Sequence, residues 1–288
     1  MRPPPPLGQS FFARWTSRIA VFSVGVLATA IALHRLFGLP SLVAFNLARL
    51  AFAGAVLSLL FALFATVGIW RTGRPGTPRI VFAILVSLGL LAWPLIYLPQ
   101  YESLPKINDI TTDGVNPPAF VAIAKLRGPG ANPIAYPGAA LAKAQAAAYP
   151  DIKGIELNRS VDEAFEVATD AVRHLKLNVV GQEAPNPKTG APGLIEIVDR
   201  SMIVGFYDDV VIRVWGNEER ARIDVRSQSR FGSFDLGRNA DHVRQLLKDF
   251  VVRMESVIPA EHQKGVAKAK DDVKEEQQRN RRLRRPRR

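Results

Sequence analysis

The sequence has no cysteine among its 288 residues. This absence excludes disulfides, thiolate zinc sites and cysteine nucleophiles. Histidine is scarce as well: of the four, His34 lies in an apolar run, His174 and His242 lie on predicted helices, and His262 lies in the C-terminal tail. Histidines scattered in this way do not indicate a metal centre, so we predict no metal and no cofactor.

Acidic residues are missing from the first 79 positions, which carry eight Arg. Residues 259–288 carry 11 Lys and Arg against five acids, whereas residues 80–258 carry 19 against 21. The formal net charge of +12 is therefore concentrated at the two ends of the chain. A folded nucleic-acid-binding domain usually concentrates positive charge on its own surface, so nucleic acid is not the expected partner.

Charged residues are rare in three long apolar runs, Ile19–Leu33, Leu50–Trp70 and Ile80–Leu98. Each is about long enough to cross a bilayer as a helix, and the first can be extended to Leu39. Helices this apolar on every face are hard to place in a small soluble core, so we predict three transmembrane helices. The alternative of a cleaved signal peptide is disfavoured, because the small-residue triplet at 28–30 lies inside the first run.

Arginines in the short loops predict the orientation. Three Arg precede the first run and three lie between the second and third, but only two lie between the first and second. Positively charged loops remain in the cytoplasm. We therefore predict a multi-pass membrane protein with a cytoplasmic N-terminus and an extracytoplasmic domain after about Tyr101. The lipid bilayer is its first predicted partner.

Residues 101–158 are rich in Pro, Gly and Asn, which predicts an extended connector with one short helix at Gly138–Ala148. Within it, Asp109 and Asp113 match the start of a calcium-binding loop. However, Phe120 stands where that loop needs a bidentate Glu, so we expect ordinary turns.

The next hundred residues show the order of an α+β domain. Ser160 and Glu163 form a capping box before a helix that is predicted to end near Lys176. A final helix with an apolar stripe is predicted to end near Ile258. The strands between them are predicted at Leu177–Val180, Leu194–Val198, Asp209–Trp215 and Ala221–Gln228.

The predicted architecture is a bundle of three transmembrane helices followed by a small antiparallel sheet. Two helices cover one face of this sheet, and the other face is expected to be open. The predicted divisions are a membrane anchor at 1–100, the connector at 101–158, the α+β domain at 159–258 and a disordered basic tail at 259–288.

Alternation in the last two strands predicts how they pair. The register that keeps apolar residues on one face avoids setting them against charges. It also gives a cross-strand ion pair and a cation–π contact between Trp215 and Arg222. The predicted pairs are Val214 with Ile223, Ile212 with Val225, Arg213 with Asp224, Trp215 with Arg222, Val211 with Arg226 and Asp209 with Gln228.

Four segments resemble a known family in the same order along the chain. They are INDITTDGVNPPAF, AAYPDI, DDVVIRV and RIDVRSQSRFGSFDLGRNADHVR. Over about residues 104–256 they are similar to the bacterial and plastid family called domain of unknown function 1499. The resemblance implies a domain tethered behind a few membrane spans, in this case in a bacterial cytoplasmic (inner) membrane, and it implies no activity.

The stretch RSQSRFGSFDLGRNADHVRQLL, residues 226–247, has two interpretations. In one, Asp209 neutralises one or both neighbouring arginines across the sheet, and an Asp or Asn caps the final helix. In the other, the open sheet face binds an anionic or planar ligand beside the helix N-terminus. The candidate ligand-binding residues are Arg213, Trp215, Arg226, Arg230, Asp235 and Asn239.

We predict a non-catalytic, membrane-tethered domain that binds an envelope protein or an anionic ligand. Two alternatives remain open. A small envelope hydrolase would use Ser227 or Ser229 with His242, although the nucleophile-elbow spacing is absent. A cytoplasm-facing module would use the Arg-rich tail, QQRNRRLRRPRR, to bind nucleic acid or lipid.

Overall fold

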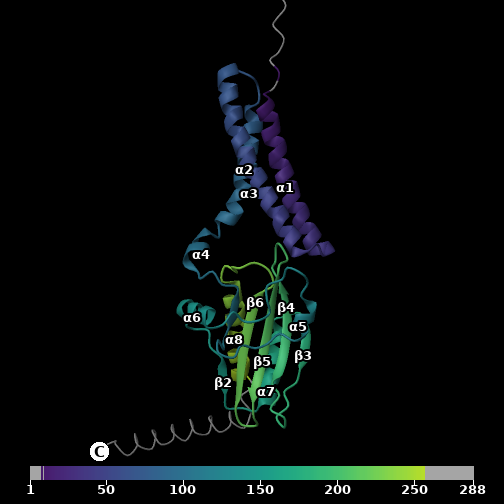
Figure 1. The fold of residues 1–288 in the computed structure, drawn as a ribbon, viewed down its shortest axis with the longest axis vertical. Helices are drawn as coiled ribbons and strands as arrows, with labels where there is room; N and C mark the ends of the chain where they lie inside the picture. The colour runs from purple at the N-terminus through teal and green to yellow at the C-terminus, as the bar shows by residue number, and fades with distance from the viewer. Residues whose placement is uncertain (1–7, 9, 257–288) are drawn as a thin grey trace, which may run out of the picture.

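The computed structural model describes residue 8 and residues 10–256, and Figure 1 shows a helical bundle joined to a sheet domain. The bundle consists of α1 (Phe11–Phe37), α2 (Ser41–Thr72) and α3 (Thr77–Leu95). All three are long and apolar enough to cross a membrane, as predicted. Each helix begins several residues before the apolar run from which it was predicted. The first two end where Gly38 and Gly73 adopt the left-handed conformation that stops a helix.

Small residues let α1 and α2 approach closely. Ala55 and Ser58 of α2 are fully buried, and a Cβ atom on Gly54 would lie only 2.3 Å from Oγ of Ser23 in α1. The Thr16 hydroxyl donates a hydrogen bond of 2.7 Å to the backbone oxygen of Ser58. Close packing of small residues and interhelical hydrogen bonds are the contacts that hold helices together in lipid.

The domain is built on a six-stranded antiparallel sheet in the order β1-β6-β5-β4-β3, with β2 also paired to β6. The strands are β1 (Asp109–Thr111), β2 (Ile155–Leu157), β3 (Val179–Glu183), β4 (Gly193–Arg200), β5 (Tyr207–Gly216) and β6 (Ala221–Ser229). The predicted register of β5 with β6 is confirmed at every pair, including Arg213 opposite Asp224. The period-two alternation therefore determines which side chains face the core.

Two helices, α7 (Val161–His174) and α8 (Arg238–Ser256), cover one face of the sheet, as predicted. Their apolar stripes pack on the strands in a core that includes Phe165, Ile212 and Phe250. At the start of α7, the Ser160 hydroxyl accepts a hydrogen bond of 3.2 Å from the Glu163 N–H. This is the cap that the capping box predicts.

The other face of the sheet is covered, and the prediction of an open face was wrong. Its cover is residues 112–137, named here the cover segment, which contains α5 (Ala122–Leu126). Ile123 and Phe120 of this segment form an apolar cluster with Val198 and Val211 of the sheet. The predicted connector thus belongs to the folded domain. It also supplies β1, β2 and the helix α6 (Ala139–Ala148), whereas α4 (Leu98–Ser103) begins in the predicted anchor.

Candidate functional site

The six predicted site residues lie in two separate places. Arg213, Trp215, Arg226 and Arg230 belong to the face under the cover segment, where the three arginines are buried. Asp235 and Asn239 belong to the start of α8, on the opposite face. The structure therefore does not bring the six residues together as one ligand site.

Arg226 forms a complete set of contacts inside the protein. Its side chain is only 2% exposed. Its Nε and Nη2 atoms donate to the two carboxylate oxygens of Asp109 at 3.0 and 2.8 Å, and it also donates to the backbone oxygens of Pro118 and Ile134. Burial raises the pKa of Asp109, although the hydrogen bond and charge of Arg226 partly offset that rise. This arginine is thus committed to holding the cover segment.

Asp209 neutralises Arg230, as one interpretation expected, but its second partner is Arg127 of the cover segment rather than Arg226. The distance between Arg127 Nε and Asp209 Oδ2 is 2.8 Å. Burial lowers the pKa of Arg127, while the charge and hydrogen bond of Asp209 act in the opposite direction. A single carboxylate in the sheet therefore balances two arginines that arrive from different segments.

The predicted ion pair between Arg213 and Asp224 is present at 2.8 Å. Arg213 also pairs with Asp113 of the cover segment at 3.0 Å. The predicted cation–π contact has a different partner, because Arg213 rather than Arg222 lies over the Trp215 ring, 5.8 Å from its centroid. Arg222 instead donates to Asp224, and the Trp215 indole N–H does the same.

Glu196 of β4 fixes the start of α5. Its carboxylate accepts hydrogen bonds from three successive backbone N–H groups, those of Val121, Ala122 and Ile123, at 3.0, 2.7 and 2.9 Å. These are groups that a helix N-terminus leaves without partners in the helix. The negative charge also suits the positive end of the helix dipole.

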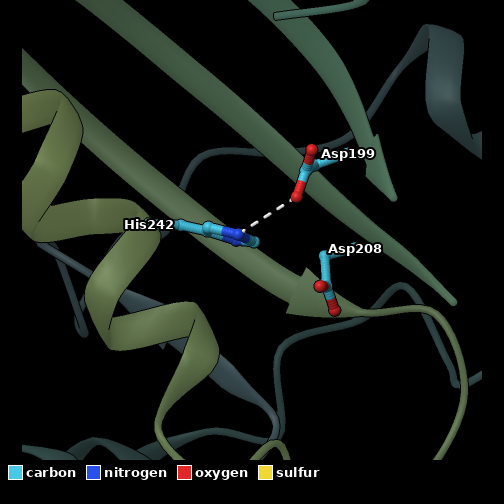
Figure 2. Close-up of side chains that lie close together, drawn as sticks. All are labelled: Asp199, Asp208 and His242. Atoms are coloured by element: carbon cyan, nitrogen blue, oxygen red, sulfur yellow. Dashed lines mark ion pairs between the residues drawn. The ribbon is translucent and has the colours of Figure 1, made fainter. Parts of the chain in front are cut away.

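A second polar cluster lies at the end of the helix-covered face nearest the bundle. Figure 2 shows His242 reaching from α8 toward Asp199 at the end of β4, with Asp208 of β5 beside them. The distance from His242 Nε2 to Asp199 Oδ2 is 3.2 Å. The Arg238 guanidinium bridges the two carboxylates, donating to Asp208 and, at 2.6 Å, to Asp199.

This cluster has the residue types of a metal site, and the ligand atoms of Asp199, Asp208 and His242 lie within 4.8 Å of one another. Arg238 already supplies a positive charge to both carboxylates, so a metal ion would have to displace it. Burial acts to raise the pKa of Asp199, but His242 and Arg238 outweigh it, and the pKa is lowered. The cluster is consistent with a structural ion-pair network.

Ser227 lies beside this cluster, 3.3 Å from His242 Nδ1, and its side chain is fully buried. Its hydroxyl donates to Asn239 Oδ1 at 2.6 Å. The Asn239 amide in turn donates to Ser229 Oγ and to the backbone oxygen of Asn108. A hydroxyl that is enclosed and directed toward an amide oxygen lacks the geometry of a nucleophile activated by histidine. Asp235, not Asn239, caps α8, because it accepts the N–H groups of Gly237 and Asn239.

A mainly apolar cavity lies between the bundle and the domain, with a volume of about 510 Å³. Its walls come from all three long helices and include Leu27, Ile31, Phe45, Phe52, Trp93 and Tyr97. The domain supplies the polar end of the cavity through Asp235, Arg238 and Asp241. Burial raises the pKa of Asp235, against the opposing effect of its hydrogen bonds from Gly237 and Asn239. A concave apolar surface with a few polar groups at one end is the usual form of a small-molecule site.

The turn between β4 and β5 holds the domain against the bundle next to this cavity. The Phe206 ring stacks on Phe45 of α2, with ring centroids 4.1 Å apart. Arg35 of α1 donates to the backbone oxygen of Ser201 at 3.0 Å, and Arg200 approaches the backbone oxygen of His34 at 3.4 Å. The cavity is therefore bordered by direct contacts between the two parts of the chain.

Comparison with known families assigns the folded domain. Residues 109–250 match the model of a family described as protein of unknown function, DUF1499. The domain belongs to the DUF1499 family. The matched residues extend from β1 through most of α8, so the DUF1499 domain includes the cover segment and leaves out the three long helices. No curated protein and no solved structure matches the chain.

Neither the cavity nor three residues of the polar cluster, namely Asp199, Asp208 and Arg238, were predicted from the sequence. The pair Asp208-Asp209 did contain a signal, because neighbouring residues of a strand face opposite sides of the sheet. One aspartate of such a pair therefore points toward the element that covers the second face of the sheet. The His174 partner was also unforeseen, since its Nδ1 lies 3.2 Å from Asp249 on α8.

Proposed function

We propose that this DUF1499 protein is a membrane-anchored, non-catalytic binding protein whose ligand is an amphiphile held in the cavity between the bundle and the domain. The cavity carries this proposal, because its walls are apolar side chains of three membrane-type helices and its far end is polar. An amphiphile presents that same division between an apolar body and a polar head. The enclosed Ser227 hydroxyl supports a binding role over hydrolysis.

The location of the polar end favours a ligand that enters from the bilayer. Trp93 and Tyr97 line the cavity near the end of α3, a position typical of aromatic residues at a membrane interface. An amphiphile in the lipid could place its chain among the helices and its head against the domain without crossing water. The three buried arginines under the cover segment are committed to carboxylates, which gives no support to an anionic ligand at that face.

Filling the cavity is expected to weaken amphiphile binding by about tenfold, a loss of about 1.4 kcal/mol. The test uses a chain with Trp15, Trp70 and Trp215 changed to Phe, so that Trp93 reports from the cavity wall. In nanodiscs, a bromine-tagged fatty acid should quench Trp93 saturably. Ala48→Phe, which adds a ring to the lining, should raise the half-saturating concentration.

Ala32→Phe is the matched control, because Ala32 is exposed on α1 and does not line the cavity. It should leave the quenching curve unchanged. Quenching that rises linearly with the fatty acid, or that is equal in both Phe variants, would contradict binding in the cavity.

We further propose that the domain is extracytoplasmic in a bacterial inner membrane, where an envelope protein is a second possible class of partner. The lack of cysteine makes a direct test possible. Val115→Cys, at a side chain that is 98% exposed, should react with a membrane-impermeant thiol reagent in intact cells whose outer barrier, if present, is permeabilised. Gly8→Cys, before α1, should react only after lysis.

The reverse labelling pattern would place the domain in the cytoplasm. The Arg-rich tail, which lies outside the described residues, would then become the leading candidate for binding nucleic acid or lipid. The cavity proposal would survive that result, because the cavity belongs to the contact between bundle and domain in either orientation.

A further inference from the structure

Two guanidinium groups converge beside the turn between β4 and β5. A Cβ atom on Gly205 would lie 3.2 Å from Nη2 of Arg200 and 3.6 Å from Nη1 of Arg35. Both groups therefore approach one point within 4 Å, although they come from positions about 165 residues apart. Two positive charges this close repel each other unless an anion or solvent screens them.

In the described residues these two arginines have no counter-ion, and the Arg200 guanidinium also lies over the Tyr207 ring, 4.7 Å from its centroid. Within the described part of the chain, their hydrogen-bond acceptors are backbone oxygens, those of His34, Arg35, Ser201 and Gly205, and neither arginine has a carboxylate partner. The arginines under the cover segment differ, since each of them is paired with an aspartate. Both side chains are also exposed, so an anion can reach them.

Exposed apolar side chains surround the arginine pair. Met202 and Ile203 at the tip of the turn are 84% and 57% exposed, and Leu36 and Phe37 at the end of α1 are 72% and 77% exposed. Exposure of apolar side chains to water is unfavourable, and their burial in the interface of a bilayer is favourable. The tip is continuous with the end of α1, so the same lipid layer that surrounds α1 can cover it.

The depth of Arg35 along α1 matches the level of lipid phosphates. Trp15 lies 20 residues before Arg35 on the same helix, which corresponds to ~30 Å at 1.5 Å per residue, the thickness of a hydrocarbon core. Aromatic residues mark one interface, and the arginine then lies at the other, on the side of the domain. Arginine guanidinium groups bind phosphate through paired N–H donors.

We propose that Arg35 and Arg200 together bind the phosphate of a membrane phospholipid, with Met202 and Ile203 inserted among its acyl chains. The site is separate from the cavity, since none of these four residues lines it. A lipid bound here joins α1 to the β4–β5 turn and so links the bundle to the domain. This inference does not depend on the amphiphile proposal.

The test uses the full chain, purified in an uncharged detergent and stripped of lipid. Phosphatidylglycerol added in mixed micelles should raise the melting temperature, and native mass spectrometry should detect the retained lipid. Diacylglycerol, which has the chains without the phosphate, should do neither. The double variant Arg35→Gln, Arg200→Gln should need at least about ten times more phosphatidylglycerol for the same shift.

Arg49→Gln is the matched control, because Arg49 is also exposed in the bundle but donates to Asn46, away from the pair. It should bind phosphatidylglycerol like the unchanged chain. If the double variant melts too early to titrate, Arg35→Lys, Arg200→Lys keeps the charge and should show a smaller loss. Equal binding by the Gln variant, or an equal shift with diacylglycerol, would overturn the proposal. An equal rise in melting temperature with inorganic phosphate alone would show that the bound phosphate need not belong to a lipid, and would overturn the phospholipid as the ligand.

Discussion

Replacing Arg226 with Ala is expected to lower the free energy of unfolding by about 3–5 kcal/mol, because it leaves a buried carboxylate without its partner. Asp109 is 0% exposed, and its bidentate contact with Arg226 joins β1 to β6. The backbone oxygens of Pro118 and Ile134 would lose a donor as well. Denaturation of the full chain in detergent, followed by Trp215 fluorescence after the other three Trp are changed to Phe, would measure the loss.

Two further variants test whether the loss of stability comes from breaking a buried ion pair rather than from removing any arginine. Arg173→Ala removes an arginine whose side chain is 75% exposed and whose partner is also exposed, so it should cost no more than about 1 kcal/mol. The double variant Arg226→Met, Asp109→Leu removes both charges and should recover much of the loss, because an apolar pair needs no compensating partner. If Arg226→Ala cost no more than Arg173→Ala, the buried pair would not hold the cover segment.

Replacing Glu196 with Ala is expected to release the cover segment from the sheet. The change leaves three N–H groups at the start of α5, those of residues 121–123, without their acceptor, at roughly 1 kcal/mol or more for each group. A total of about 3 kcal/mol corresponds to a more than hundredfold increase in the opened population. Hydrogen–deuterium exchange of the peptides from 112–137 should therefore accelerate strongly, while peptides from β5 should change little.

Glu183→Ala provides the comparison for this effect. Glu183 is an exposed glutamate at the end of β3, so the variant loses the same charge without uncovering any donor. It should exchange like the unchanged chain. Glu196→Gln keeps one carbonyl acceptor and should lie between the two. Unchanged exchange at α5 in Glu196→Ala would mean that apolar contacts of Phe120 and Ile123 hold the segment without the carboxylate.

Local patterns in the sequence predicted the elements that form by local rules. Apolarity alone located α1, α2 and α3, and strict alternation set the register of β5 with β6. The serine cap of α7 followed from short-range hydrogen bonding, whereas the sequence left the cap of α8 open between Asp235 and Asn239.

The features that the sequence did not predict depend on contacts between residues far apart in the chain. β1 has three residues and α5 has five, too few for a periodic pattern. Nothing near Asp109 in the sequence indicates that its partner is Arg226, 117 positions later. The cavity has walls from one part of the chain and its polar end from another, so no single stretch contains its signature.

The order of the chain has a consequence for when the domain can fold. The cover segment and β1 are synthesised before β6, the strand they pair with and cover. At 5–20 residues per second, Asp109 waits roughly ten seconds for Arg226 to leave the ribosome. The cover segment therefore cannot pack on the sheet until β6 has been synthesised. The domain therefore folds late during synthesis, after the three apolar helices have already left the ribosome.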